Sequence, residues 1–278
     1  MGLGDIMLDI LKSIILGIIE GITEWLPISS TGHLIIADEF IKLNMSEDFM
    51  QMFNVVIQLG AILAVVVIYF KQMWPFTLKK EEHYIKKDVF SMWFKVIVAI
   101  LPAAIIGIPL DDLFEEKFHN YIVVSLALIV YGIAFIVIEK RNKHLKPKVG
   151  SIGEITYKTA FLIGCFQALS LIPGTSRSGS TILGAILIGV SRVTAAQFSF
   201  YMAVPVMFGA SFIKLLKFGL DFTSTELIIL LVGMVTAFLV SVIAIKFLMN
   251  YIKKRDFTAF GYYRIVLGVI VLLYFVLK

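Results

Sequence analysis

The chain has 278 residues, of which 59% are hydrophobic and 16% are charged, and its mean hydropathy is +0.92. These values exclude a soluble globular domain and predict a polytopic helical membrane protein. The formal net charge of +5 requires no nucleic-acid partner, because the lysines cluster in loops as membrane topology demands, and the single cysteine, Cys165, excludes an internal disulfide.

The first apolar segment, residues 10–26, contains two glutamates and is too interrupted to be a simple membrane span. A short helix is predicted over 34–40, so residues 10–40 are expected to form a re-entrant hairpin that enters the membrane and returns. Three apolar segments of membrane-spanning length complete the first half: 50–70, 93–110 and 121–138.

The same order of elements then starts again. A half-length helix over 159–171 is broken at PGTSRSGST, residues 173–181, and a second short helix is predicted over 182–190. These two helices form a second re-entrant hairpin, residues 159–190. Three further apolar spans follow it: 195–216, 226–250 and 259–277.

The repeated order predicts an all-α polytopic fold in a single membrane domain, residues 1–278. Each half consists of one broken re-entrant hairpin and three transmembrane helices. The first repeat covers 1–140, and an inverted second repeat covers 154–278.

Loop charges indicate independently how the halves are oriented. Three connections carry more lysine and arginine than acid, whereas two others each carry four acids and one lysine. The basic connections are 71–95, 139–158 and 251–258, and the acidic ones are 38–49 and 111–119. Placing the basic connections in the cytoplasm gives a consistent alternation across six spans. Three spans per half then invert the second repeat, so the two broken hairpins enter from opposite faces and can meet near the midplane.

The stretch GIIEGITEWLPISSTGH, residues 17–33, places charge inside an apolar run. Glu20 and Glu24 share one helical face with two glycines, because these four residues are spaced three or four apart. Pro27 ends the helix. Three hydroxyl residues and a histidine follow it: Ser29, Ser30, Thr31 and His33. Ionisable groups at membrane depth are costly, so we interpret this stretch as a functional site.

The second broken loop has the features of an anion-binding site. A helix begins there, and the free N–H groups and dipole of a helix start favour an anion. Arg177 adds a permanent charge whose planar fork suits phosphate oxygens. Four hydroxyl donors accompany it: Ser176, Ser178, Ser180 and Thr181. Together with a serine nucleophile (Ser29 or Ser30), His33 and two carboxylates from the first loop, this site indicates phosphoryl transfer or hydrolysis.

A divalent cation is expected at the acidic pair. Bare carboxylates repel a phosphate, so a cation would bridge Glu20 and Glu24 to it, unless one of them acts as a base or orients His33. Oxygen ligands suit Mg²⁺ or Ca²⁺, whereas zinc would require more nitrogen or sulfur.

The main alternative is a transporter or flippase for an anionic substrate, because inverted repeats with broken helices are a transporter architecture. The serine–histidine loop favours hydrolysis, since transport does not require it. Another superfamily of membrane lipid phosphatases needs a second histidine after its Ser-Arg motif, and Ser176-Arg177 is followed by SGSTILGAIL without one. Hydrolysis combined with some lipid movement stays open.

The two motifs in combination resemble the signatures of the bacitracin-resistance type of undecaprenyl-diphosphate phosphatase, and the resemblance covers essentially the whole chain. It implies a multi-pass enzyme of the bacterial cytoplasmic membrane that hydrolyses undecaprenyl diphosphate to undecaprenyl phosphate and inorganic phosphate. This reaction recycles the carrier lipid for cell-wall synthesis and gives bacitracin resistance. The resemblance also implies a divalent cation and a pocket that opens to the outer face.

The resemblance further implies a role for each motif residue. Glu20 and Glu24 match an acidic pair, Ser30 a nucleophile and Arg177 the phosphate-binding arginine. His33 matches a histidine with an acid/base or nucleophilic role. The supporting hydroxyls are Ser29, Thr31, Ser176 and Thr181.

Two mechanisms are compatible with these residues. In one, Ser30 loses its proton to His33 or a glutamate and attacks the terminal phosphorus, and water then hydrolyses the phosphoserine. In the other, water attacks directly with His33 as the base. The expected partners are a polyprenyl diphosphate lipid and the membrane, and the prediction allows for a homodimer.

Overall fold

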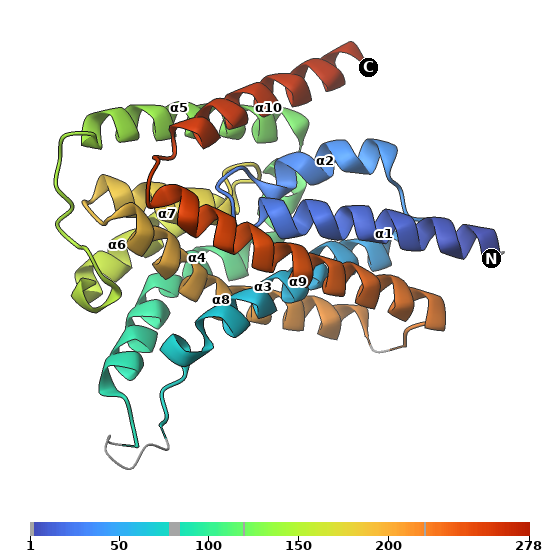
Figure 1. The fold of residues 1–278 in the computed structure, drawn as a ribbon. Helices are drawn as coiled ribbons and strands as arrows, with labels where there is room; N and C mark the ends of the chain where they lie inside the picture. The colour runs from blue at the N-terminus through green and yellow to red at the C-terminus, as the bar shows by residue number, and fades with distance from the viewer. Residues whose placement is uncertain (1–2, 78–83, 119, 220) are drawn as a thin grey trace.

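The computed structural model describes residues 3–77, 84–118, 120–219 and 221–278, and in these ranges the chain is helical without strands. The first half contains α1 (Leu3–Thr23), α2 (Ser30–Phe40), α3 (Glu47–Met73), α4 (Lys87–Phe118) and α5 (Tyr121–Asn142). The second half contains η1 (Ile152–Glu154), α6 (Tyr157–Ala168), η2 (Leu169–Leu171), α7 (Arg177–Leu187), α8 (Arg192–Phe218), α9 (Ser224–Ile252) and α10 (Thr258–Leu277). The predicted all-α class is confirmed (Figure 1).

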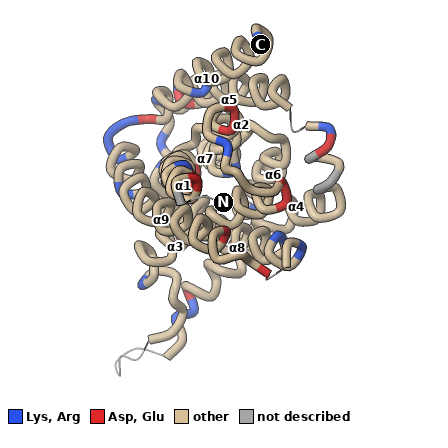
Figure 2. The backbone as a smooth tube through the Cα atoms, turned by 90° about the vertical axis from the view of Figure 1, so that its right-hand side faces the viewer, with Lys and Arg blue, Asp and Glu red and all other residues tan. Residues whose placement is uncertain are grey.

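Six helices are long and apolar enough to cross a membrane: α3, α4, α5, α8, α9 and α10. Their most apolar windows have mean hydropathies between 1.5 and 2.9, which confirms a polytopic membrane protein. Charged residues lie mainly at helix ends and in the connections, as Figure 2 shows. Residues 78–83 and 119, which belong to two of the charged connections, lie outside the described residues.

The two broken hairpins have similar turns. We call residues 24–30 the first tip and residues 172–177 the second tip. Each tip contains a proline, which cannot continue the hydrogen bonding of the preceding helix. Each leads into a serine N-cap whose hydroxyl accepts a backbone N–H three residues later, Ser29 from Gly32 at 3.3 Å and Ser176 from Gly179 at 3.1 Å. Both serines have a left-handed backbone, with φ of 72° and 70°.

Helix pairs correspond between the halves. The first helix of each hairpin packs along a span of the other half, α1 along α9 and α6 along α4, while α3 pairs with α8 and α5 with α10. Glycines permit this close packing: a Cβ at Gly17 would lie 2.7 Å from the carbonyl oxygen of Gly233, and one at Gly164 would lie 2.2 Å from that of Ala99. An inverted repeat requires such matched pairs. The division at 1–140 and 154–278 stays a prediction.

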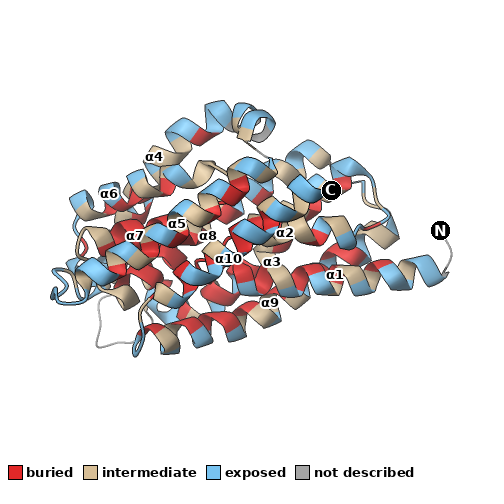
Figure 3. Cartoon of the chain, turned by 90° about the horizontal axis from the view of Figure 1, so that it is seen from above, coloured by how far each residue is buried: buried red, intermediate tan, exposed pale blue. Residues whose placement is uncertain are grey.

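Figure 3 shows buried positions along the inner faces of several helices, and α7 is buried over most of its length. In α7, every residue from 178 to 186 is buried, whereas in α2 only Gly32 and Ala37 are. The helix that follows the second tip is therefore embedded in packed helices, whereas the helix that follows the first tip lies at the periphery. The first tip itself is buried from residue 24 to residue 29.

Candidate active site

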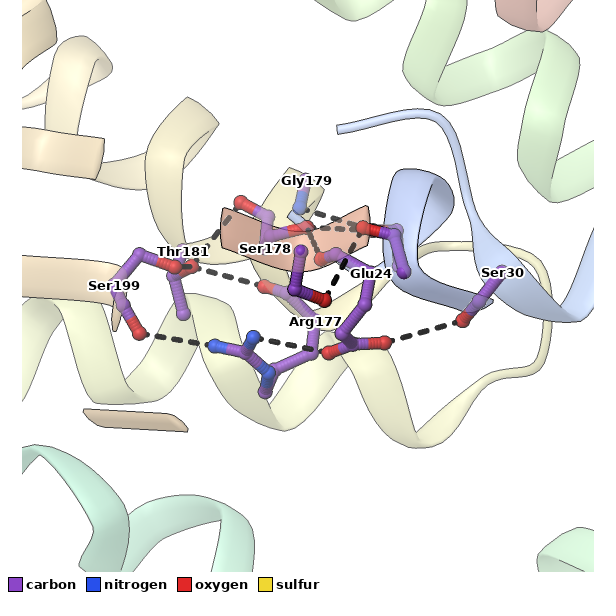
Figure 4. Close-up of polar contacts among 10 residues, drawn as sticks. Glu24, Ser30, Arg177, Ser178, Gly179, Thr181 and Ser199 are labelled. Carbon is purple, nitrogen blue, oxygen red and sulfur yellow. Dashed lines mark hydrogen bonds and ion pairs between the residues drawn. The ribbon is translucent and has the colours of Figure 1, made fainter. Parts of the chain in front are cut away.

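Glu24 of the first tip and Arg177 of the second tip form an ion pair. Nη2 of Arg177 donates to Oε1 of Glu24 at 3.0 Å, and the two side chains are only 12% and 10% exposed (Figure 4). Ions that are paired and shielded from water interact more strongly than an exposed surface pair does. Residues 153 positions apart in the sequence therefore face each other, in the middle of an apolar bundle.

The second oxygen of the same carboxylate accepts a hydrogen bond from the first tip. Oγ of Ser30 donates to Oε2 of Glu24 at 3.3 Å. Ser30 is the first residue of α2, where the free N–H groups and the helix dipole stabilise negative charge. This environment favours the loss of a hydroxyl proton, and the carboxylate that could accept the proton lies within hydrogen-bond distance.

Arg177 is held on its other side by α8. Nη1 donates to the backbone carbonyl of Ser199 at 2.9 Å, and the guanidinium lies 5.9 Å from the ring centroid of Trp25. The hydroxyls of Ser199 and Thr181 are hydrogen-bonded at 2.6 Å. Nε of Arg177 is buried and has no hydrogen-bond partner. The guanidinium is thus fixed in direction while part of its donor capacity is unused.

The predicted supporting hydroxyls are engaged by the protein itself. Ser178 donates to the backbone carbonyl of Glu24 at 3.0 Å, and Thr181 donates to that of Arg177 at 2.9 Å. Ser29 and Ser176 cap α2 and α7. These four residues shape the two tips, and direct contact of their hydroxyls with a substrate stays a prediction. Thr31 lies beside Ser30 in the first turn of α2, half-buried.

His33 is placed apart from this network. Its Nδ1 lies 2.7 Å from the carbonyl oxygen of Ser29, and its Nε2 lies 2.7 Å from the hydroxyl of Tyr263 on α10. If Nδ1 carries the proton that is donated to Ser29, Nε2 accepts from Tyr263. The two rings are also stacked, with centroids 5.6 Å apart. In the described residues Glu24 and not His33 is hydrogen-bonded to Ser30.

Glu20 lies one helical turn before Glu24, whose N–H donates to the carbonyl of Glu20 at 3.0 Å. Its side chain is 0% exposed, and neither carboxylate oxygen has a hydrogen-bond partner. Two buried oxygens without a donor suit a hard cation or a shared proton. The described residues hold no group of three potential His, Cys, Asp or Glu metal ligands, so a cation at this pair would need further oxygen ligands from water, hydroxyl or carbonyl groups or from the substrate.

Four residues that the motifs did not single out belong to or adjoin the site. Ser199 and Trp25 contact Arg177, Tyr263 contacts His33, and Arg264 lies buried behind the tips. The sequence contained a signal for Arg264 alone, because an arginine within a predicted membrane span indicates a functional position. The backbone carbonyl of Ser199 has no signature in the sequence.

Comparison with known proteins gives a consistent result over nearly the full length. The family described as "Bacitracin resistance protein BacA" matches residues 13–270. A protein named undecaprenyl-diphosphatase from Acetivibrio thermocellus is 63% identical over 269 residues, which cover 97% of this chain and 98% of the relative. A protein of the same name from Enterococcus faecalis is 62% identical, covering 95% and 96%, and one from Lactiplantibacillus plantarum is 56% identical, covering 98% and 99%.

Proposed function

This chain belongs to the bacitracin resistance protein BacA family, and on that premise we propose that its two hairpin tips form the site of undecaprenyl diphosphate hydrolysis. The chain is an undecaprenyl-diphosphatase that releases inorganic phosphate and undecaprenyl phosphate. This activity supports cell-wall synthesis and bacitracin resistance. The residues that carry out the reaction are the subject of the proposal.

One observation carries the assignment: the carboxylate of Glu24 accepts hydrogen bonds from Ser30 and from Arg177 at the same time. A nucleophile, a base and a phosphate-binding cation are thereby within reach of one another. Structural capping alone does not require this arrangement, since Ser29 and Ser176 already cap the two helices.

Substrate binding changes the partners of Arg177. The terminal phosphate accepts hydrogen bonds from the guanidinium, whose Nε has no partner among the described residues. It also accepts from the free N–H groups at the start of α7. Glu24 then loses part of its ion pair, and its carboxylate is free to accept the hydroxyl proton of Ser30. The base is therefore activated when the diphosphate is in place.

In the chemical step, Oγ of Ser30 attacks the terminal phosphorus while Oε2 of Glu24 accepts the hydroxyl proton. An Oγ–P bond forms, the bond between the terminal phosphorus and the bridging oxygen breaks, and the lipid phosphate leaves with the electron pair. Water then attacks the phosphoserine, which releases inorganic phosphate and returns the proton to Ser30. The competing route, direct attack by water with His33 as base, needs His33 to turn away from Tyr263.

Glu20 and Glu24 are the residues that would hold a Mg²⁺ or Ca²⁺ ion, because Glu20 offers two unpaired buried oxygens. A bound divalent cation supplies neutralisation of the charge on the diphosphate.

The substrate reaches the site from the membrane. His33 and Tyr263 are partly exposed on the flank between α2 and α10, and this flank suits the entry of a lipid whose tail stays in the bilayer. We further propose that the pocket opens to the outer face of the bacterial cytoplasmic membrane, opposite the basic loops. A homodimer stays a prediction.

The test is phosphate release from undecaprenyl diphosphate by detergent-purified protein, with and without a chelator. We expect Glu24→Ala and Arg177→Ala to lose activity. Lys246→Ala should keep it, because Lys246 is exposed on the surface of α9. Acid quenching during turnover should trap a phosphoserine at Ser30. Full activity of both tip variants would move the site elsewhere, and near-normal turnover by Ser30→Ala would remove the covalent route.

A further inference from the structure

Arg264 is a charged residue in the middle of the apolar span α10, and its side chain is 0% exposed. In the described part of the chain no carboxylate lies within ion-pair distance of it. A buried charge without a counter-charge is costly unless its donors are satisfied. Among the described residues Nε of Arg264 has no hydrogen-bond partner, so the contacts of its two Nη groups indicate why it is there.

Those contacts are backbone carbonyls of both hairpin tips. Nη1 donates to Pro27 at 3.2 Å, and Nη2 donates to Gly174 at 2.9 Å and to Thr175 at 3.0 Å. Pro27 and Gly174 each stand two residues before the serine N-cap of their own hairpin. The two ends of one guanidinium fork thus hold corresponding carbonyls of the two halves.

The surroundings are shaped to admit this side chain. A Cβ at position 179 would lie 3.0 Å from Nη1, so Gly179 leaves room for the guanidinium. The ring of Tyr131 on α5 lies 5.4 Å from the guanidinium carbon, at cation–π distance. Gly174 has φ of +91°, and a Cβ there would lie 2.6 Å from the carbonyl oxygen of Val124, so the carbonyl that Arg264 holds sits in a turn that only glycine fits.

Backbone carbonyls in the unwound turn between two half-helices are free of helical hydrogen bonds and can bind a cation. In transporters built from inverted repeats, such carbonyls coordinate a mobile coupling ion. We propose that Arg264 is a positioning residue that acts as a built-in cation at this place and holds the two tips at the separation that the reaction needs.

This inference rests on the proposed active site, because the tips that Arg264 joins carry Glu24, Ser30 and Arg177. Separating the tips would strip hydrogen bonds from a buried charge, so the Glu24–Arg177 contact is fixed before substrate arrives. The tips do not depend on an ion from solution, and they stay together throughout the catalytic cycle.

The experiment removes Arg264 and supplies its functional group from solution. We expect Arg264→Ala to lower kcat for undecaprenyl diphosphate by about 100-fold, the effect of a small misplacement of reacting groups, while KM changes by less than about threefold. Because the variant leaves a cavity lined by three carbonyls, millimolar guanidinium should restore part of kcat in a saturable manner. A folding role alone does not predict recovery by guanidinium in protein that is already purified.

Arg192→Ala is the matched control. Arg192 also joins segments of the chain, since its Nε donates to the buried Glu139 at 2.9 Å, but it lies at the start of α8 and away from both tips. We expect this variant to lose thermal stability, to keep the kcat of the folded protein and to show no response to guanidinium.

Parent-like kcat in Arg264→Ala would overturn the inference, as would a loss that guanidinium does not restore in monodisperse protein. If Arg264→Ala does not fold, Arg264→Lys decides: its single ammonium cannot span both tips, so kcat should stay at least about 10-fold low, and normal kcat would contradict us. If the proposed active site itself is wrong, Glu24→Ala and Arg177→Ala remain active, and this result differs from every outcome for the Arg264 variants.

Discussion

The two hairpin tips share one backbone design and carry opposite chemistry. In both, a serine with φ near 70° caps the second half-helix, and the next residue carries the functional group, Ser30 in one tip and Arg177 in the other. The first tip contains Glu24 and follows Glu20, whereas the second carries the arginine. A single structural device, used twice, therefore places the proposed nucleophile, Ser30, and the proposed phosphate-binding residue, Arg177, on the two oxygens of Glu24.

The helices that follow the two tips differ in how deeply they are buried. Residues 178–186 of α7 are all buried, while α2 has two buried residues and lies next to α10 at the periphery. The helix that begins with Arg177 is thus part of the packed core, and the helix that carries Ser30 and His33 lies at the periphery, where we propose that the lipid arrives.

Removal of Arg177 should have the largest effect. In Arg177→Ala the diphosphate loses its cationic partner, and Glu24 loses the ion pair that positions it, so kcat/KM should fall by about 10⁴-fold. Arg177→Lys keeps the positive charge but lacks the planar fork, so its kcat/KM should stay below about a tenth of the parent value. Phosphate release measures both, and a loss below 10-fold in the alanine variant would show that the second tip does not bind the substrate phosphate.

The next largest effect is expected at Ser30, and adjacent Ser29 is its control. Ser30→Ala removes the proposed nucleophile, so kcat should fall by at least about 100-fold. Ser29→Ala removes only a helix cap, which should cost about 1 kcal/mol of stability with kcat nearly unchanged. The same measurements on both variants separate the two roles. Equal losses of kcat would mean that the serines act together as a structural unit.

Gly174→Ala tests whether the second tip requires its left-handed turn. The added Cβ meets the carbonyl of Val124, and φ of +91° is strained for alanine, so the variant should be destabilised by about 1–3 kcal/mol. Gly209→Ala, in α8, is the control, because a Cβ there meets nothing within 4 Å. Thermal inactivation in detergent compares them, and equal midpoints would contradict the described turn.

The smallest effect is expected at Tyr263, which holds His33 at the rim of the first tip. Tyr263→Phe removes the hydrogen bond to Nε2 and keeps the stacked ring, so kcat/KM should change by less than about 10-fold. A loss above 100-fold would place His33 in the chemical step and would favour direct attack by water.

Patterns of hydropathy and charge predicted the fold class, the six spans and both interrupted hairpins, because membrane burial imposes strong constraints on length and charge. The motifs also identified Glu24, Ser30 and Arg177, whose contact the structure describes. The partner of His33 and the carbonyls around Arg264 could not be predicted, since they depend on how α10 packs against both tips and on backbone atoms that no residue type marks. The sequence left the base for Ser30 open between His33 and a glutamate, and the hydrogen bond from Ser30 favours Glu24.

The central claim is that the two tips act as one site through Glu24 and Arg177. A double-mutant cycle on kcat/KM tests it most directly, with Glu24→Gln, Arg177→Met and the double variant compared with the parent protein. We predict strong coupling, so that the kcat/KM of the double variant is no lower than that of the less active single variant. This result corresponds to an interaction free energy of at least about 2 kcal/mol. Losses that simply multiply in the double variant would contradict a shared site.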